Sequence, residues 1–357
     1  MSAFNSELYH SGLCPHFPDF LKKYLTLPIL TRLKGIGLLC GTDWTPLYYN
    51  HFFYSRFEHS VGCALIAWNF TKDKKQAIAS LLHDVSTTIF SHVSDFRKGD
   101  ALTQSVTENE NKSIILNSVE LAELLKQDGL TLLDVCDYHK YPICDNDIPG
   151  LSSDRLEYMY PSGMSLADEV IKNQPLWNFD LVKQSYNDIV ILKNEFGVEE
   201  LGFNSAEIAQ DYCKRCCDVG LILQRNENKL ALNMLGRIVN LAIKEKLISE
   251  ESCYSSSEEQ IIKIFDEYAK CNTTELASLI KTFRTMKKIT HSDTLPENTD
   301  EFYVVNLSVK KRYINPLVKN TNGNAVRISE VSNIARECIN DFLAFNDTVY
   351  GFVKLVK

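Results

Sequence analysis

The sequence predicts a mainly α-helical protein, and three observations support this class. Glycine and proline are scarce, at 15 and 10 of 357 residues, which argues against a turn-rich β sandwich. Apolar residues recur at helical intervals through most of the chain. Hydrophobic residues make up 45% of the chain, which is enough for a large buried core.

Helical periodicity places helices over most of the first half of the chain. The expected helices span residues 20–39, 59–70, 76–83, 111–126 and 154–160. Gly129 is expected to act as a stop signal after the fourth of them. Pro161 is expected to end the fifth, because the residue before a proline avoids the helical conformation. The polar, proline-containing residues 134–150 are expected to form a loop.

The second half of the chain combines helices with a small β element. Helices are expected over residues 206–218, 230–246, 257–269, 274–286 and 329–345. Residues 302–309 and 311–318 are rich in Val, Tyr and Ile, so we expect antiparallel strands there, with Pro316 indicating an edge. The expected organisation is a helical core over residues 1–180, followed by a C-terminal helical region over residues 181–357 that serves oligomerisation or forms a substrate lid.

Composition limits the classes of function. The chain has 38 basic and 46 acidic residues and a net charge of −8, so it lacks the basic field of a general nucleic-acid-binding protein. No apolar run approaches the ~20 residues of a membrane span, and the N-terminus lacks the features of a secretory signal. The 11 scattered cysteines therefore indicate reduced thiols in a cytoplasmic protein. The CKRCC cluster at residues 213–217 has no second ligand pair for a structural zinc site.

The segment SLLHDVSTTIFSHVSDF, residues 80–96, carries the strongest chemical signal. It holds His83, Asp84, His92 and Asp95 close together, and the His-Asp pair ends an apolar helical run. Side chains at the end of such a run can point into a site. A His-Asp pair alone is weak evidence of function, because chance produces such pairs in a chain of this composition. The surrounding sequence is therefore what gives the pair meaning.

Two further blocks supply that context. The block YSRFEHSVG, residues 54–62, places Arg56 one helical turn before His59. The block SSDRLEY, residues 152–158, contains Asp154, which by itself could equally cap a helix together with a glutamate three residues later. Imidazoles and carboxylates together suit a borderline divalent ion such as Fe, Mn, Co or Ni.

The three blocks together resemble the HD-domain phosphohydrolase superfamily, whose signature is H…HD…D. They are most similar to its branch of deoxynucleoside triphosphate triphosphohydrolases, over roughly residues 28–161. The resemblance implies an HD-domain helical bundle that binds one divalent metal ion, Fe, Mn, Co or Ni, with Mg or Zn as alternatives. The implied metal ligands are His59, His83, Asp84 and Asp154. The implied substrate-binding residues are Arg56, Arg155 and Tyr158.

The sequence departs from that branch at several positions. Thr87 and, in an ungapped alignment, Asn109 stand where histidines are typical, and Leu38 stands where some members have a glutamine for sugar or base recognition. Loss of a general acid typically costs about 10²–10⁴ in rate. Three interpretations remain open: His92 or Asp95 supplies the proton, the substrate is another phosphate ester, or the site binds its ligand without rapid turnover.

The expected function is therefore metal-dependent hydrolysis of a phosphate ester by activated water. The substrate would be a nucleotide, either a dNTP or a nucleoside monophosphate, or a related ester, and His92 and Asp95 are the candidate catalytic residues. The alternative is a catalytically weak regulatory HD protein that binds nucleotide or single-stranded nucleic acid. The resemblance also implies a homo-oligomer. Neither a membrane nor, in view of the acidic charge, nucleic acid is favoured as a partner.

Overall fold

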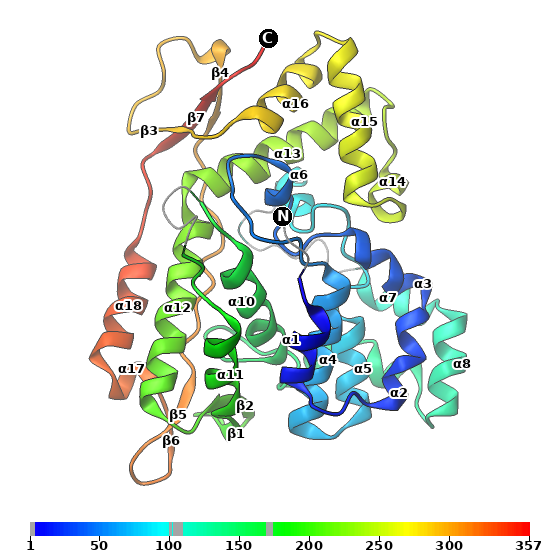
Figure 1. Ribbon diagram of the computed structural model, residues 1–357, viewed down its shortest axis with the longest axis vertical. Coiled ribbons are helices and arrows are strands. Elements are labelled where there is room, and N and C mark those ends of the chain that lie inside the picture. Colours follow the sequence, from blue (N-terminus) through cyan, green and yellow to red (C-terminus); the bar gives the residue numbers. More distant parts are fainter. Residues whose placement is uncertain (1–3, 100–101, 103–109, 169–173) are drawn as a thin grey trace.

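The computed structural model describes residues 4–99, 102, 110–168 and 174–357. Within these ranges the chain forms eighteen α-helices and seven short strands (Figure 1), which confirms the mainly α class. No described helix is both long and apolar enough to cross a bilayer. Asn109 lies outside the described residues.

Helices α4 (Arg56–Thr71) and α5 (Lys74–Leu82) lie side by side in Figure 1 and form the centre of the first half of the chain. The expected helix over residues 20–39 is wrong: the chain forms short helices there, and Pro28 starts a new one at its first position. The expected helix over residues 111–126 is divided because the side chain of Ser118 caps a second helix. The α-helices are α1 (Ser6–Leu13), α2 (Asp19–Lys22), α3 (Pro28–Thr31), α4 (Arg56–Thr71), α5 (Lys74–Leu82), α6 (Val93–Arg97), α7 (Asn111–Leu116), α8 (Val119–Gln127), α9 (Leu132–Val135) and α10 (Ser153–Ser165).

Helix α10 continues through Pro161, so the expected end at residue 160 is wrong. A proline inside a helix leaves the carbonyl four residues earlier without its helical partner. That carbonyl belongs to Glu157, and it accepts a hydrogen bond from the hydroxyl of Tyr9 at 3.5 Å. Tyr9 on α1 thereby compensates for the missing N–H of Pro161.

The second half contributes long helices and two small sheets. The helices are α11 (Phe179–Asn187), α12 (Ala206–Gln224), α13 (Asn226–Lys244), α14 (Glu250–Ser255), α15 (Glu258–Cys271), α16 (Glu275–Thr285), α17 (Ile328–Val331) and α18 (Asn333–Ala344). The strands are β1 (Ile189–Lys193), β2 (Glu199–Phe203), β3 (Thr290–Ser292), β4 (Phe302–Val305), β5 (Leu317–Lys319), β6 (Ala325–Arg327) and β7 (Tyr350–Lys354). One sheet has the order β1-β2-β5-β6 and the other β3-β7-β4.

The β element differs from its expected form in two respects. The strand expected over residues 311–318 is reduced to β5, which pairs in parallel with β2 and antiparallel with β6. Pro316 precedes β5, which is an inner strand rather than an edge, and its carbonyl accepts a hydrogen bond from the Ile328 N–H at 2.9 Å. The proline is tolerated because it lies just outside the ladder and therefore removes no bond from it.

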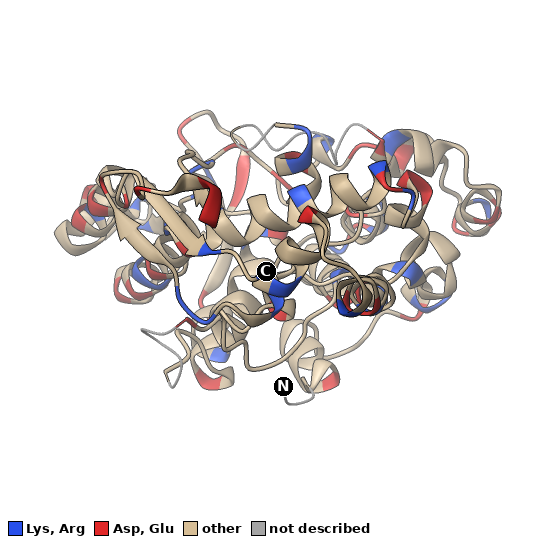
Figure 2. Cartoon of the chain, turned by 90° about the horizontal axis from the view of Figure 1, so that it is seen from above, with Lys and Arg blue, Asp and Glu red and all other residues tan. Residues whose placement is uncertain are grey.

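Two hydrophobic clusters form the core. The larger contains residues of α4, α5, α10, α12 and α18, and the smaller contains residues of α6, α13, α15 and α16. The larger cluster includes residues from both sides of position 180, and the domain boundary expected there stays a prediction. Acidic and basic residues are interspersed in the view from above (Figure 2).

A histidine links the second sheet to α13. His291 on β3 lies with Nε2 2.8 Å from Glu227 Oε1 and with Nδ1 3.1 Å from Asp347 Oδ1. Burial alone would lower the pKa of His291, but the two carboxylates raise it above its ordinary value. The ring therefore joins the first turn of α13 to the segment before β7 through two polar contacts.

Candidate metal centre

Three helix ends bring the candidate metal ligands together. Helix α4 starts at Arg56 because Ser55 and Glu58 form a reciprocal capping box, and it presents His59 on its first turn. Helix α5 ends at Leu82, so the His-Asp pair follows directly at its C-terminal end. Helix α10 is capped by the side chain of Ser152 and carries Asp154 in its first turn. The alternative in which Asp154 itself caps this helix is therefore wrong.

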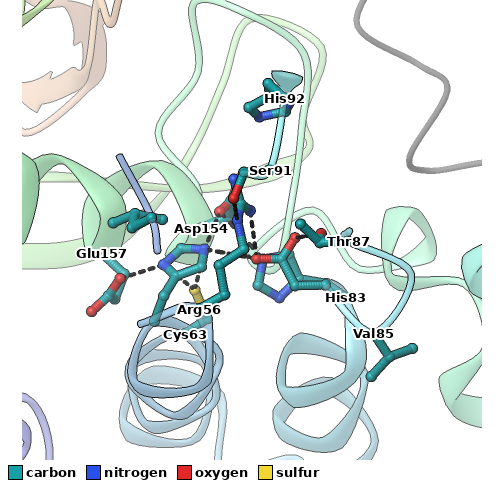
Figure 3. Close-up of polar contacts among 12 residues, drawn as sticks. Arg56, Cys63, His83, Val85, Thr87, Ser91, His92, Asp154 and Glu157 are labelled. Atoms are coloured by element: carbon teal, nitrogen blue, oxygen red, sulfur yellow. Dashed lines mark hydrogen bonds and ion pairs between the residues drawn. The ribbon is translucent and has the colours of Figure 1, made fainter. Parts of the chain in front are cut away.

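Two of the predicted ligands, His83 and Asp154, lie close together in Figure 3, and the measured distances place the other two beside them. His59 Nε2 lies 3.1 Å from His83 Nε2 and 3.1 Å from Asp154 Oδ1. Asp84 Oδ2 lies 3.6 Å from His83 Nε2 and 3.8 Å from His59 Nε2. Two ligands of one ion at ~2.1 Å are about 3–3.5 Å apart, so these side chains can hold a metal with small adjustments. The donor set of imidazole nitrogens and carboxylate oxygens fits a borderline divalent ion.

Each histidine is oriented by a contact through its other nitrogen. His83 Nδ1 lies 2.7 Å from the carbonyl of Ser80, and His59 Nδ1 contacts a carboxylate oxygen of Glu157. These contacts fix the ring planes and direct both Nε2 atoms toward the shared centre. Glu157 is fully buried and also accepts a hydrogen bond from the Tyr54 hydroxyl at 2.6 Å.

The backbone of α4 leaves room for Glu157 only because residue 62 is glycine. A methyl group at Gly62 would lie 2.6 Å from the Glu157 Cγ atom, which is closer than nonbonded carbon atoms approach. Gly62 stands one turn after His59 on α4. The close contact between α4 and α10 thus brings the carboxylate of Glu157 to the His59 ring.

Two neighbours extend the ligand cluster. The Cys63 thiol lies 3.8 Å from His59 Nε2 and belongs to the same group of potential metal ligands. Burial raises the pKa of this thiol, which disfavours the thiolate that a metal would require. Asp84 is a better match than Cys63 for the fourth ligand, because it is held as a carboxylate. Arg56 forms an ion pair with it, and the Arg56 Nη1 atom lies 2.7 Å from Asp84 Oδ2.

The carboxylates are held in their charged forms. Burial alone would raise the pKa of Asp84, but Arg56 and the two histidines hold it well below its ordinary value. Burial opposes the charge of Asp154 in the same way, and hydrogen bonds from His59 and His83 lower its pKa. Both carboxylates are therefore ready to bind a cation at neutral pH.

The segment after Asp84 forms a strained turn that positions Arg56. Thr87, at a position where a histidine was expected, donates its hydroxyl to Asp84 Oδ1 at 2.9 Å. Phe90 and Ser91 both have positive φ angles, 60° and 54°, a conformation that costs non-glycine residues about 1–3 kcal/mol each. Ser91 Oγ accepts a hydrogen bond from Arg56 Nε at 2.7 Å.

A distant glutamate holds this turn in place. Glu258, the first residue of α15, is fully buried, and its Oε1 accepts hydrogen bonds from the backbone N–H groups of Gly37 and Phe90 at 2.9 and 2.8 Å. Its Oε2 accepts a bond from Trp44 Nε1 at 2.7 Å. Ser91 completes the link by donating to the Gly37 carbonyl at 2.7 Å.

The two candidate catalytic residues form a pair. His92 Nδ1 lies 2.9 Å from Asp95 Oδ2, and Asp95 is fully buried. Burial lowers the pKa of His92, and the charges of Arg312 and Arg56 lower it further. A neutral ring that donates its Nδ1 proton to Asp95 keeps a lone pair on Nε2. His92 lies apart from the ligand cluster in Figure 3.

A cavity of about 170 Å³ is shared by the candidate metal ligands and His92. Its walls include Arg56, the four predicted ligands, His92 and Tyr158. Arg155 is not among the described residues that line it. The guanidinium of Arg155 instead binds the carbonyl of Gly150 at 2.8 Å and contacts Asn146, so its expected contact with a phosphate stays a prediction.

Two curated proteins match part of the chain. It is 28% identical over 149 residues to the uncharacterized protein YdhJ of Bacillus subtilis, covering 40% of this chain and 43% of that protein. It is 28% identical over 114 residues to the metal-dependent phosphohydrolase cns2 of Cordyceps militaris, covering 31% of this chain and 32% of that protein. The chain thus matches less than half the length of these relatives. No family model matches the chain.

Solved structures match over nearly the whole chain. A phosphohydrolase from Bacteroides thetaiotaomicron superposes with a TM-score of 0.62 at 13% identity, covering 96% of this chain and 97% of that one. A hypothetical protein from Aquifex aeolicus superposes with a TM-score of 0.61 at 12% identity, covering 95% and 93%. At these identities the structures define the fold alone. One partial relative is thus named as a metal-dependent phosphohydrolase, and this chain brings together His59, His83 and Asp154 in a group of side chains that could hold a metal ion.

Proposed function

We propose that this protein is a metal-dependent phosphohydrolase that cleaves a small phosphate ester. The observation that carries the proposal is the convergence of His59, His83, Asp84 and Asp154 at one end of a cavity that also contains Arg56. A divalent ion held by these four side chains would acidify a water molecule and offset the negative charge of the phosphate.

The chain's own residues would handle charge and proton transfer. Arg56 would place its positive charge against the phosphate oxygens, and Ser91 would hold its guanidinium in position. His92 would exchange a proton at Nε2 while Asp95 keeps the ring in one orientation. Tyr158 lines the same cavity and would contact the rest of the substrate.

The size of the cavity favours a small substrate. Pockets that enclose drug-sized ligands measure about 300–1,000 Å³, whereas this cavity measures about 170 Å³. A phosphate monoester or a nucleoside monophosphate is therefore favoured over a nucleoside triphosphate. Thr87 supports the same choice, because its hydroxyl binds Asp84 and offers no imidazole to protonate a poor leaving group.

Turnover by metal-loaded protein tests the proposal. The purified chain would be loaded in turn with Mn²⁺, Fe²⁺, Co²⁺ and Ni²⁺ and assayed for phosphate release from simple phosphomonoesters, nucleoside monophosphates and dNTPs. We expect release of inorganic phosphate from a monoester, loss of this activity in Asp84→Ala, and no change in Asp180→Ala, a control at an exposed aspartate on α11. If no metal gives turnover above that of Asp84→Ala, the proposal is wrong.

His92 can be tested separately from the metal ligands. We expect His92→Ala to lower kcat by about 10²–10⁴ while the metal content per chain, measured by elemental analysis, stays at the wild-type level. If the variant loses metal together with activity, His92 supports the metal centre and its proposed role in proton transfer is wrong.

A further inference from the structure

The cavity has a second basic region, which the metal centre does not explain. Lys310 and Arg312 both line the cavity. They come from the extended segment between β4 and β5, far along the chain from the metal ligands. Lys311, between them, points elsewhere: its Nζ binds the carbonyls of Leu343 and Phe345 at the end of α18, at 2.5 and 2.7 Å. In extended chain, neighbouring side chains point to opposite sides, so residues 310 and 312 share the side that faces the cavity.

This segment is fixed against the protein by its backbone. The carbonyl of Lys310 accepts a hydrogen bond from Gln224 Nε2 at 3.0 Å. The carbonyl of Ile314 accepts one from the thiol of Cys213 at 3.4 Å. Both partners lie on α12, one of the helices that form the larger core cluster. The two basic side chains are therefore carried by an anchored backbone.

The charge of Arg312 acts on the groups around the metal centre. Burial raises the pKa of Tyr158, and the nearby charge of Arg312 opposes that rise. Burial lowers the pKa of His92, and Arg312 and Arg56 both add to the fall. Both arginines therefore lie within electrostatic reach of the candidate proton-transfer group.

The wall of the cavity carries basic side chains in two separate places. The basic side chains are Arg56, Lys310 and Arg312, and the carboxylates are those of Asp84 and Asp154. Arg56 pairs with Asp84 beside the candidate ligands, whereas Lys310 and Arg312 belong to a different segment of the wall. The whole chain, by contrast, carries a net charge of −8, so the positive charge is a local property of the cavity.

We propose that Arg312, assisted by Lys310, binds a second anionic group of the substrate. The substrate class would then be a phosphate ester that carries a further phosphate or a carboxylate at some distance from the phosphate that is cleaved. This inference rests on the proposed phosphohydrolase function, and it names the substrate class of the same site. Arg312 would determine specificity, because its guanidinium matches the geometry of a phosphate or carboxylate.

Binding of phosphonates, which the enzyme would not cleave, tests this proposal. Calorimetry on Mn²⁺-loaded protein would compare alkylphosphonates with α,ω-alkane bisphosphonates of two to five carbons. We expect at least one bisphosphonate to bind wild type ~10-fold or more tightly than the alkylphosphonate of equal length. Arg312→Ala and the longer Arg312→Gln should lose this preference, while their affinity for the alkylphosphonate stays within about twofold. Lys311→Met, whose side chain points away from the cavity, should keep the preference.

Two results would overturn the assignment. One is a wild type without preference for any bisphosphonate, and the other is an equal loss of affinity for both ligand types in the Arg312 variants. Because phosphonates are not turned over, the outcome does not depend on catalysis. A protein that prefers bisphosphonates but cleaves no phosphate ester would contradict the proposed function and leave the anion site in place.

Discussion

Replacing Glu258 by glutamine should remove a pH dependence from the stability of the protein. Burial raises the pKa of Glu258 to about 7, above its ordinary value of 4.5. A carboxyl group whose pKa is raised by folding stabilises the protein at low pH, and that contribution is lost as the pH rises through the raised value. Glu258 joins α15 to the turn at Phe90, so the loss would be felt beside the metal centre.

The size of this pH dependence follows from the pKa shift of Glu258. With pKa values of 4.5 in the unfolded chain and about 7 in the folded one, linkage gives a loss of about 2.5 kcal/mol between pH 5 and pH 8. Glutamine keeps an acceptor for the N–H groups of Gly37 and Phe90, but its amide group faces the indole N–H of Trp44. The variant should therefore be less stable than wild type at pH 5 by about 1–3 kcal/mol, and the difference should shrink or reverse by pH 8.

Urea unfolding at several pH values measures both quantities. The control is Glu259→Gln, which changes the exposed neighbouring glutamate on α15 and should follow wild type at every pH. If Glu258→Gln and wild type lose stability in parallel between pH 5 and pH 8, the carboxyl is not protonated in the folded protein and the reasoning fails.

Three further predictions concern contacts described above. Glu157→Gln should weaken metal affinity about 10–100-fold in calorimetric titrations, because the carboxylate that orients His59 is removed; unchanged affinity would contradict this role. Ser91→Ala should lower kcat/KM by about 10²-fold through misplacement of Arg56, with metal content retained, and a loss of metal instead would show that the serine supports the ligands. His291→Gln should lower the unfolding temperature more at pH 5.5 than at pH 8.5. A histidine whose pKa is raised by folding stabilises the fold below its ordinary pKa, and this effect is lost as the pH rises. An equal effect at both pH values would show that the charge of His291 plays no part.

The four candidate ligands were chosen from three short sequence blocks that together resemble the signature of a known superfamily. His83 and Asp84 follow the end of α5, His59 lies in the first turn of α4, and Asp154 lies in the first turn of α10. The structure brings these four side chains together, and their role as metal ligands stays a prediction, as do the oligomeric state and the cytoplasmic location. Hydrophobic periodicity alone also placed most long helices close to their observed positions.

The contacts that support the ligands had no local signal. Glu157 has the spacing of a capping residue relative to Asp154, yet Ser152 caps α10 and Glu157 turns to His59. Glu258 is 168 positions from Phe90, and such a long-range bond leaves no pattern in a single sequence. The positive φ angle of Phe90 could not be predicted from the sequence, because an aromatic residue rarely adopts it. Tertiary contacts offset its cost, and local propensity does not describe them.

The antiparallel hairpin of β1 and β2 was not predicted, although its sequence carries a recognisable pattern. The run IVILK forms β1, and it is followed by a turn in which Gly197 has φ of +77°. A β-branched run before a glycine-containing turn is typical of a hairpin. The β2 strand that follows is EELGF, whose glutamates and glycine are poor strand formers. Pairing with β1 and β5 decides its conformation.

The layout of the cavity separates two tasks along the chain. Every candidate metal ligand comes from the first 165 residues, whereas Lys310, Arg312 and part of the apolar wall come from beyond residue 219. Substitutions in the late segment could change which molecules bind without touching the candidate metal ligands. Over evolutionary time such a division would let related chains bind new molecules by changing the wall while the candidate metal centre is inherited unchanged.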